Sequence, residues 1–184
     1  DNDSFENRFG EGNRYRQITT VRQRNADLGE ILGLEVAYQQ PFTFLPAPFN
    51  GLGLQSNLTV TDSEVSVPTR ESELPFFQQA DLVYNVVPFF QKSGFEVRAA
   101  LNYQGDYLED LGDSSESDAY IDDRTTVDLT ANYSFTSLLG EPELFLQIEN
   151  LTNEPEVTYA GQESSLGFHY LSGTTTTVGL SVQL

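Results

Sequence analysis

The sequence predicts an all-β fold, an antiparallel sheet of the kind that forms part of a transmembrane β-barrel. Three observations support this class. Apolar and polar residues alternate in about seven segments, the links between segments are alternately short and long, and the last segment alternates up to Leu184. No stretch approaches the roughly 18 consecutive apolar residues that a membrane-spanning helix requires. We therefore expect strands, not helices, to carry the fold.

Each predicted strand has one apolar and one polar face. In chain order the predicted strands cover residues 33–39, 52–62, 81–86, 95–104, 126–135, 144–149 and 174–184. Their apolar faces consist of Leu34, Val36 and Tyr38; Leu52, Leu54, Leu58 and Val60; Leu82, Tyr84 and Val86; Phe95, Val97, Ala99, Leu101 and Tyr103; Val127, Leu129, Ala131, Tyr133 and Phe135; Leu144, Leu146 and Ile148; and Val178, Leu180, Val182 and Leu184. Because no charged residue falls on these faces, we expect a two-sided sheet.

The links between the strands also follow a pattern. The short links cover 41–51, 91–94 and 136–142, and the long acidic links cover 63–79, 105–124 and 152–173. Short turns on one side and long loops on the other are typical of outer-membrane barrels. Phenylalanines gather near the short links, and Tyr103, Tyr107 and Tyr159 lie toward the long ones, as in the aromatic belts at the two membrane interfaces. Ordinary core aromatics at hairpin ends are the alternative.

The composition excludes several kinds of protein. The 184 residues carry a formal net charge of −19, which argues against a nucleic-acid binder because such a protein needs a basic patch to neutralise phosphates. The absence of cysteine excludes disulfides and thiolate metal sites. The mean hydropathy of −0.36 is that of a soluble protein. Membrane barrels nevertheless give only a weak hydropathy signal, because half of each strand faces a polar lumen.

Five segments, taken in order, resemble a known family. Residues 32–38, 45–63, 94–103, 127–133 and 149–155 resemble the C-terminal barrel strands of TonB-dependent outer-membrane receptors. The most specific piece is Asn150-Leu-Thr-Asn-Glu154, which is followed by a long loop and a glycine-containing terminal strand. The resemblance runs from about residue 25 to the end. Two details depart from the family: Gly173-Thr174 replaces a Gly-Arg pair, and Leu184 replaces a terminal aromatic residue.

The resemblance implies a fold and a function. It implies that residues 32–184 supply about seven strands of a larger barrel of about 22, while residues 1–31 form an extracellular loop and the start of a strand. The plug domain would lie outside this chain. The implied function is active transport of a scarce nutrient across a bacterial outer membrane, with a ferric siderophore, cobalamin or an oligosaccharide as substrate. The implied partners are the plug, the remaining strands, outer-membrane lipid and the TonB–ExbB–ExbD energy-transducing complex.

The long loops contain the candidate ligand-binding residues. Tyr107 and Tyr120 belong to a loop dense in carboxylates, and their rings could stack on a sugar or chelate ring. His169, the only histidine, lies in the last long loop and is a third candidate. The alternative is a solvated acidic loop with an exposed histidine. The carboxylate spacing does not match an EF-hand, and one histidine with scattered Ser and Asp makes no triad, so we expect neither a metal, a cofactor nor an enzyme.

The polar faces of the strands are expected to line the barrel lumen. Their charged members, together with the acidic residue that opens the third strand, are Glu35, Asp81, Glu96, Arg98, Asp128 and Glu149. These side chains would contact the plug or line the substrate path, and the sequence does not separate the two roles. An alternative of a different class remains open: a soluble secreted or surface β-sandwich or barrel, with a binding or structural role, whose apolar faces form a core. Detergent dependence distinguishes the two.

Overall fold

A computed structural model of the chain describes residues 26, 28–135 and 141–183. Within them the protein is all-β and antiparallel, with two open sheets of seven and four strands and no closed barrel. The predicted loop and strand start at 1–31 falls mostly outside the described residues, as do most of the short link at 136–142 and the final Leu184.

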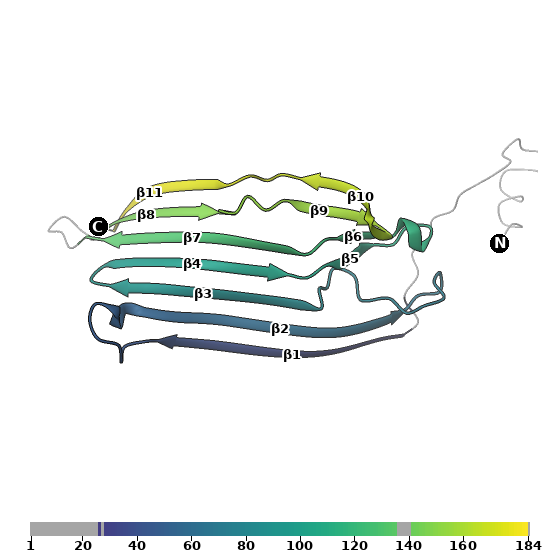
Figure 1. Ribbon diagram of the computed structural model, residues 1–184, viewed down its shortest axis with the longest axis horizontal. Coiled ribbons are helices and arrows are strands. Elements are labelled where there is room, and N and C mark those ends of the chain that lie inside the picture. The colour runs from purple at the N-terminus through teal and green to yellow at the C-terminus, as the bar shows by residue number, and fades with distance from the viewer. Residues whose placement is uncertain (1–25, 27, 136–140, 184) are drawn as a thin grey trace, which may run out of the picture.

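The seven-stranded sheet contains all seven predicted strands (Figure 1). Its strands, in spatial order, are β1 (Leu28–Pro41), β2 (Leu52–Ser66), β3 (Leu82–Lys92), β4 (Phe95–Gln104), β7 (Arg124–Ser134), β8 (Glu141–Glu149) and β11 (Thr175–Gln183). Each strand pairs with its neighbour along most of its length. The outer edges of β1 and β11 are open in the described part of the chain. The prediction of an antiparallel all-β fold is therefore confirmed.

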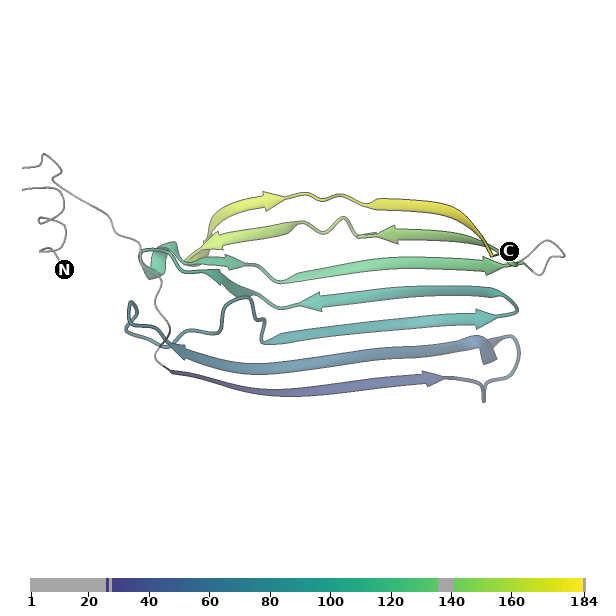
Figure 2. The same ribbon diagram turned by 180° about the vertical axis from the view of Figure 1, so that it is seen from behind.

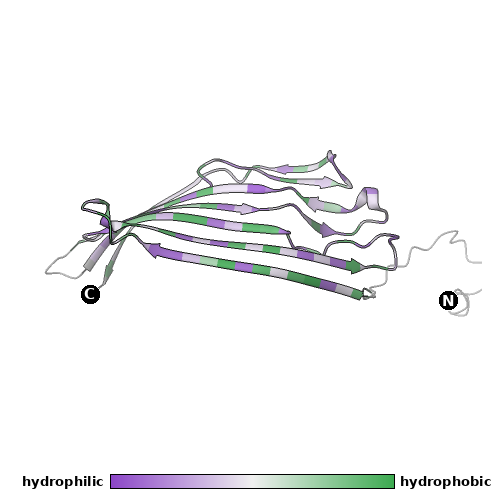
Figure 3. Ribbon diagram, turned by 60° about the horizontal axis from the view of Figure 1, so that its bottom comes forward, coloured by the Kyte–Doolittle hydropathy of each residue, from purple (hydrophilic) through white to green (hydrophobic). Residues whose placement is uncertain are grey.

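The strand register places the apolar residues of all seven strands on one face of the sheet. One cross-strand row shows this: Val36 pairs with Leu58, and Leu58 pairs with Tyr84. Farther across, Leu146 of β8 pairs with Val178 of β11 on the same face. Figure 3 shows hydrophobic and hydrophilic residues alternating along these strands. Nothing in the described residues covers the apolar face, and many of its side chains, including Leu34, Val36, Leu144, Val178 and Leu180, are exposed.

Charged side chains appear on the apolar face only near the strand ends. Lys92 ends β3 opposite Phe95, and Asp62 pairs with Leu32 beyond the predicted first strand. Between the positions of Lys92 and Asp62 along the strands, the apolar face carries no charged side chain. Aromatic pairs lie near both ends of this uncharged zone: the rings of Phe90 and Phe95 are 6.3 Å apart at the short-link end. At the other end the Tyr84 and Tyr103 rings stack at 4.9 Å.

The link from β3 to β4 is a tight two-residue turn. Ser93 and Gly94 have φ angles of 53° and 79°, as type I′ hairpins require, and Lys92 pairs directly with Phe95. A Cβ on Gly94 would lie 2.6 Å from the Ser134 carbonyl oxygen, so the neighbouring strand also excludes a side chain there. The other described short link contains a single turn of 3-10 helix, η1 (Phe49–Gly51).

The long links, predicted as acidic loops, contain a four-stranded sheet. Its strands are β10 (Gln162–Tyr170), β9 (Glu156–Ala160), β6 (Ala119–Ile121) and β5 (Tyr107–Asp110), in that spatial order. Each one continues a strand of the larger sheet: β5 follows β4, β6 leads into β7, β9 follows β8, and β10 leads into β11. Both views of the ribbon show the smaller sheet at the long-link end of these strands (Figures 1 and 2). Sequence alternation missed β5 and β6 because they are only 4 and 3 residues long.

The buried apolar side chains of the described residues all lie at this long-link end. They are Val65, Ala80, Leu108 and Tyr159. Leu108 is completely buried, and its carbonyl accepts a hydrogen bond of 2.7 Å from the Gln78 N–H. Val65 is joined to Leu74 by two backbone hydrogen bonds. The seven-stranded sheet therefore has no core of its own, whereas the long links pack around a small one.

Candidate binding site at the long-link end

The long links and the four-stranded sheet form one folded unit, which we call the cap (residues 67–81, 105–123 and 150–174). The cap is strongly acidic, with fourteen Asp and Glu residues, one Arg and one His. Its links come from three different hairpins, so its folding depends on contacts between segments far apart in the chain.

One buried ion pair joins two of these links. Arg70 donates to the Asp118 carboxylate through Nη2 and, at 3.2 Å, through Nε, and the two side chains are 7% and 1% exposed. Arg70 Nη2 also donates to the Gly112 carbonyl, and the Gly112 N–H donates to Asp118, both at 2.9 Å. The hydrogen bond to Asp118 raises the pKa of Arg70 further above its ordinary value. Both charges are therefore paired and hydrogen-bonded, as buried charges must be.

A pair of stacked tyrosines lies beside this ion pair. The rings of Tyr120 and Tyr159 lie 5.1 Å apart and nearly parallel, at 4°. The Tyr159 hydroxyl donates to the Asp106 carboxylate at 3.3 Å. Burial, followed by the negative charge of Asp106, raises the pKa of Tyr159 to about 12. Burial also raises the pKa of Tyr120. Tyr159, expected at a membrane interface, is instead a core residue of the cap.

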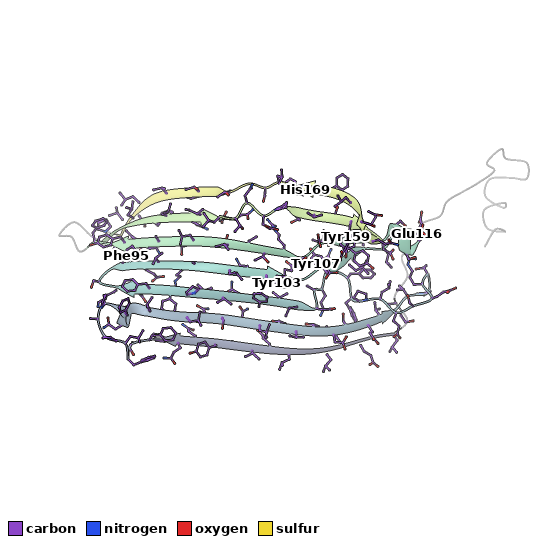
Figure 4. The ribbon with its side chains drawn as sticks, viewed as in Figure 1. Phe95, Tyr103, Tyr107, Glu116, Tyr159 and His169 are labelled. Atoms are coloured by element: carbon purple, nitrogen blue, oxygen red, sulfur yellow. The ribbon has the colours of Figure 1, made fainter. Side chains whose placement is uncertain are left out.

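The three predicted ligand residues all lie in the four-stranded sheet, but they do not form one site. Tyr107 of β5 pairs with Ile121, whereas Tyr120 of β6 pairs with Leu108, so the two tyrosines lie on opposite faces of the sheet. Tyr120 is half-buried against Tyr159 and is a packing residue. His169 is exposed on β10, the opposite edge of the sheet from β5 (Figure 4).

Asn150 connects β8 to the cap and is 8% exposed. Its φ of 52° ends the strand, and its side chain exchanges two hydrogen bonds with the Glu154 backbone, at 2.8 and 2.9 Å. The Asn150 N–H donates to Asp128 at 2.8 Å, and its carbonyl accepts from the Thr174 hydroxyl, also at 2.8 Å. The Asn-Leu-Thr-Asn-Glu stretch thus forms a strand-end junction that ties together β7, β8 and the segment before β11.

The strand register places five of the six predicted lumen residues on the polar face of the seven-stranded sheet, and Asp81 directly precedes β3. Arg98 pairs with Glu96, and its guanidinium lies 5.0 Å from the centre of the Phe89 ring. Glu149 accepts from Gln147 at 2.9 Å, and Glu35 is exposed. Burial, followed by the nearby Asp106 and Asp62 carboxylates, raises the pKa of Asp81.

A row of amides on the polar face was not anticipated from the sequence. The register sets Asn57, Asn85 and Asn102 side by side on β2, β3 and β4. Asn85 donates to Asn102, and Asn102 donates in turn to Asp128 at 2.9 Å. Beside this row lies a polar hollow of about 580 Å³ over β1, β2 and β3. The alternation within each strand already puts its asparagine on the polar face, but only the strand register shows that the three asparagines are neighbours.

The scarcity of cationic side chains is a second feature that the sequence analysis did not use. Residues 26–183 contain four Lys and Arg, and in the described structure each has a polar partner. In a chain with 28 carboxylates, this scarcity could have marked Arg70 as the anchor of the acidic links.

Among the described residues, no helix has the length and apolar character needed to cross a membrane. No group of three or more His, Asp or Glu side chains in that part of the chain could hold a metal ion. No family model, curated protein or solved structure matches the chain.

Proposed function

We propose that the chain is a segment of a transmembrane β-barrel that serves as an outer-membrane transport receptor of the TonB-dependent type. The observation that carries the proposal is the apolar face of the seven-stranded sheet, which is continuous across all seven strands. A sheet face of this size is stable in water only when it is covered. Lipid covers the equivalent face of a membrane barrel, and the polar face then lines the lumen.

Strand length supports a membrane location. A barrel strand needs about 9–11 tilted residues to cross a bilayer. β3, β4, β7, β8 and β11 have 11, 10, 11, 9 and 9 residues. The charges at the ends of the apolar face and the aromatic pairs near both limits are also arranged as at membrane interfaces. The cap, with its buried polar network, would lie outside the bilayer.

The open edges of β1 and β11 support the proposal that the chain is a segment of a larger barrel. Unpaired backbone groups at these edges would be costly in lipid, so a membrane-embedded sheet needs further strands to close it. In this proposal the remaining strands and the plug belong to the same receptor, and the TonB–ExbB–ExbD complex supplies the energy. The cap faces the cell exterior and captures the nutrient, so the chain's role is transport and not catalysis.

The soluble alternative requires a second layer over the apolar face. The four-stranded sheet does not supply that layer, because it continues four strands end to end instead of stacking on them (Figures 1 and 3). A β-sandwich buries its apolar faces between two stacked sheets. We therefore favour the membrane proposal.

A flotation experiment distinguishes the membrane proposal from the soluble alternative. The purified chain, refolded with lipid vesicles, should rise with them in a density gradient through its apolar face, without closing a barrel by itself, and should need detergent to stay monodisperse without vesicles. Protease should cleave exposed cap sites while leaving the seven strands protected. A chain that stays at the bottom of the gradient and runs as a clean monomer in detergent-free buffer would rule out the barrel.

A further inference from the structure

A polar hollow of about 410 Å³ lies at the outer end of the cap. It opens between η2 (Ser115–Ser117), a single turn of 3-10 helix, and the turn that joins β9 to β10. Its lining residues are Ser115, Glu116, Ala160, Gly161, Gln162 and Ser165. Figure 4 shows Glu116 at the end of the molecule farthest from the short links. The volume falls within the range of small-molecule sites.

The two walls of the hollow are fixed against each other. The Gly161 N–H donates to the Asp118 carbonyl at 2.9 Å, joining the β9–β10 turn to the segment after η2. Gly161 has a φ of 67°, and a Cβ there would lie 2.8 Å from the Glu116 backbone. Only glycine allows this close approach together with this backbone conformation.

The η2 wall is anchored in turn to the rest of the cap. The Ser114 and Ser117 residues form a reciprocal capping box around η2, in which the Ser114 N–H donates to the Ser117 hydroxyl at 3.0 Å. The next residue, Asp118, is held by Arg70 and by the Gly112 N–H. The hollow is therefore assembled before any ligand arrives, which lowers the entropy cost of binding.

The lining chemistry selects the ligand. The walls offer two hydroxyls, one amide and one carboxylate, all of which can bond to hydroxyl groups. No lining residue is cationic, and Arg70 nearby is already paired, so an anion would find no partner. Alanine and glycine contribute little apolar surface, and no lining residue is aromatic. We propose that the hollow binds a hydroxyl-rich ligand without negative charge, such as a sugar unit or polyol, with Glu116 accepting hydrogen bonds from ligand hydroxyls.

The role of this site as an entry point for transport rests on the proposed function, whereas ligand binding does not. Binding is measured on the folded chain in detergent micelles, so it can succeed or fail independently of the flotation result. Saturation-transfer NMR and calorimetry with maltose, cellobiose and trehalose are the neutral probes. Gluconate serves as the anionic counterpart.

We expect at least one neutral sugar to bind saturably and more tightly than gluconate. Glu116→Gln should weaken this binding about tenfold, because a hydrogen bond to a charged group is lost. Ser165→Trp, on an exposed edge strand, should abolish it by filling the hollow. Glu163→Gln is the matched control: it removes an equivalent charge from β10 outside the lining and should leave affinity unchanged.

Three results would overturn the site. The first is that no neutral sugar in the panel binds to the chain although hydrogen exchange shows that its cap is folded. The second is that binding survives Ser165→Trp, or responds equally to Glu116→Gln and Glu163→Gln. The third is that gluconate binds more tightly than the neutral sugars, which would contradict the ligand class.

Discussion

Arg70 and Asp118, 48 residues apart, form a buried ion pair that binds the β2–β3 link to the β4–β7 link. The pair makes the cap one folded unit instead of three independent loops. Because Gly112 and Gly161 also bond to Asp118, the position of the outer hollow depends on this one residue. The predictions below test this dependence and the surrounding architecture.

Breaking the ion pair should loosen the cap without unfolding the seven-stranded sheet. In Arg70→Ala the Asp118 carboxylate is left buried and unpaired, which is strongly unfavourable. We expect hydrogen-exchange rates of cap amides, such as those of Leu108 and Gly161, to rise at least about tenfold. Amides of β4 and β7 should be unaffected.

Arg124→Ala is the matched control for that variant. Arg124 pairs with Glu156 at 3.4 Å, and both side chains are partly exposed. Its removal should change cap exchange by about fivefold at most. Equal effects of the two substitutions would show that the buried pair has no special part in holding the cap together.

Asn150 should be far more sensitive to substitution than Asn153. Both have positive φ angles, of 52° and 55°. Asn150→Gly keeps the backbone conformation but removes the bonds to Glu154, and should lower the free energy of unfolding by about 1–3 kcal/mol. Asn153→Gly should change it by less than about 0.5 kcal/mol. Denaturant titrations in detergent give both values, and similar losses would contradict the junction role.

Two glycines of similar backbone conformation should respond differently to alanine. Gly94 and Gly173 have φ angles of 79° and 75°, so both substitutions carry a backbone cost of about 1–2 kcal/mol. The added Cβ meets the Ser134 carbonyl oxygen in Gly94→Ala and open space in Gly173→Ala. Gly94→Ala should therefore lower the unfolding midpoint further. An equal loss in both variants would mean that β7 yields to the new methyl group.

The cap should lose stability at high pH through Tyr159. Its pKa is raised from 10.0 to about 12 in the folded chain, so the folded state holds the proton more tightly than the unfolded state. This contribution is complete below about pH 10 and is lost as pH rises toward about 12. Tyr159→Phe should make the fall in cap stability over this range shallower. Absorbance at 295 nm should show one fewer late-titrating tyrosine in the variant than in the parent chain.

The sheet could be predicted from the sequence and the cap could not, for different physical reasons. Alternation is a local property, so Val97, Glu96 and Arg98 show their faces without knowledge of their neighbours. The burial of Asp118 depends on Arg70 from a distant link, which no local pattern reveals. Tyr159 illustrates the same limit: its position near a strand end suggested an interface, but packing against Tyr120 makes it a core residue.

The residues of the candidate site also divide into those that could be predicted from the sequence and those that could not. The polar wall was predictable because parity alone assigns Glu35, Asp128 and Glu149 to one face. The outer hollow was not, because Ser115 and Ser165 come from different hairpins and meet only through the cap network. The ligand residues expected from aromatic character alone, Tyr107 and Tyr120, lie on opposite faces of one sheet.

The central claim is that the apolar face of the seven-stranded sheet contacts lipid. The chain contains no tryptophan, so a single introduced Trp reports on one position. In vesicles with brominated acyl chains, Leu129→Trp on the apolar face of β7 should be strongly quenched, and Thr130→Trp on the polar face should not. Equal quenching of the two positions, or none in either, would contradict the claim.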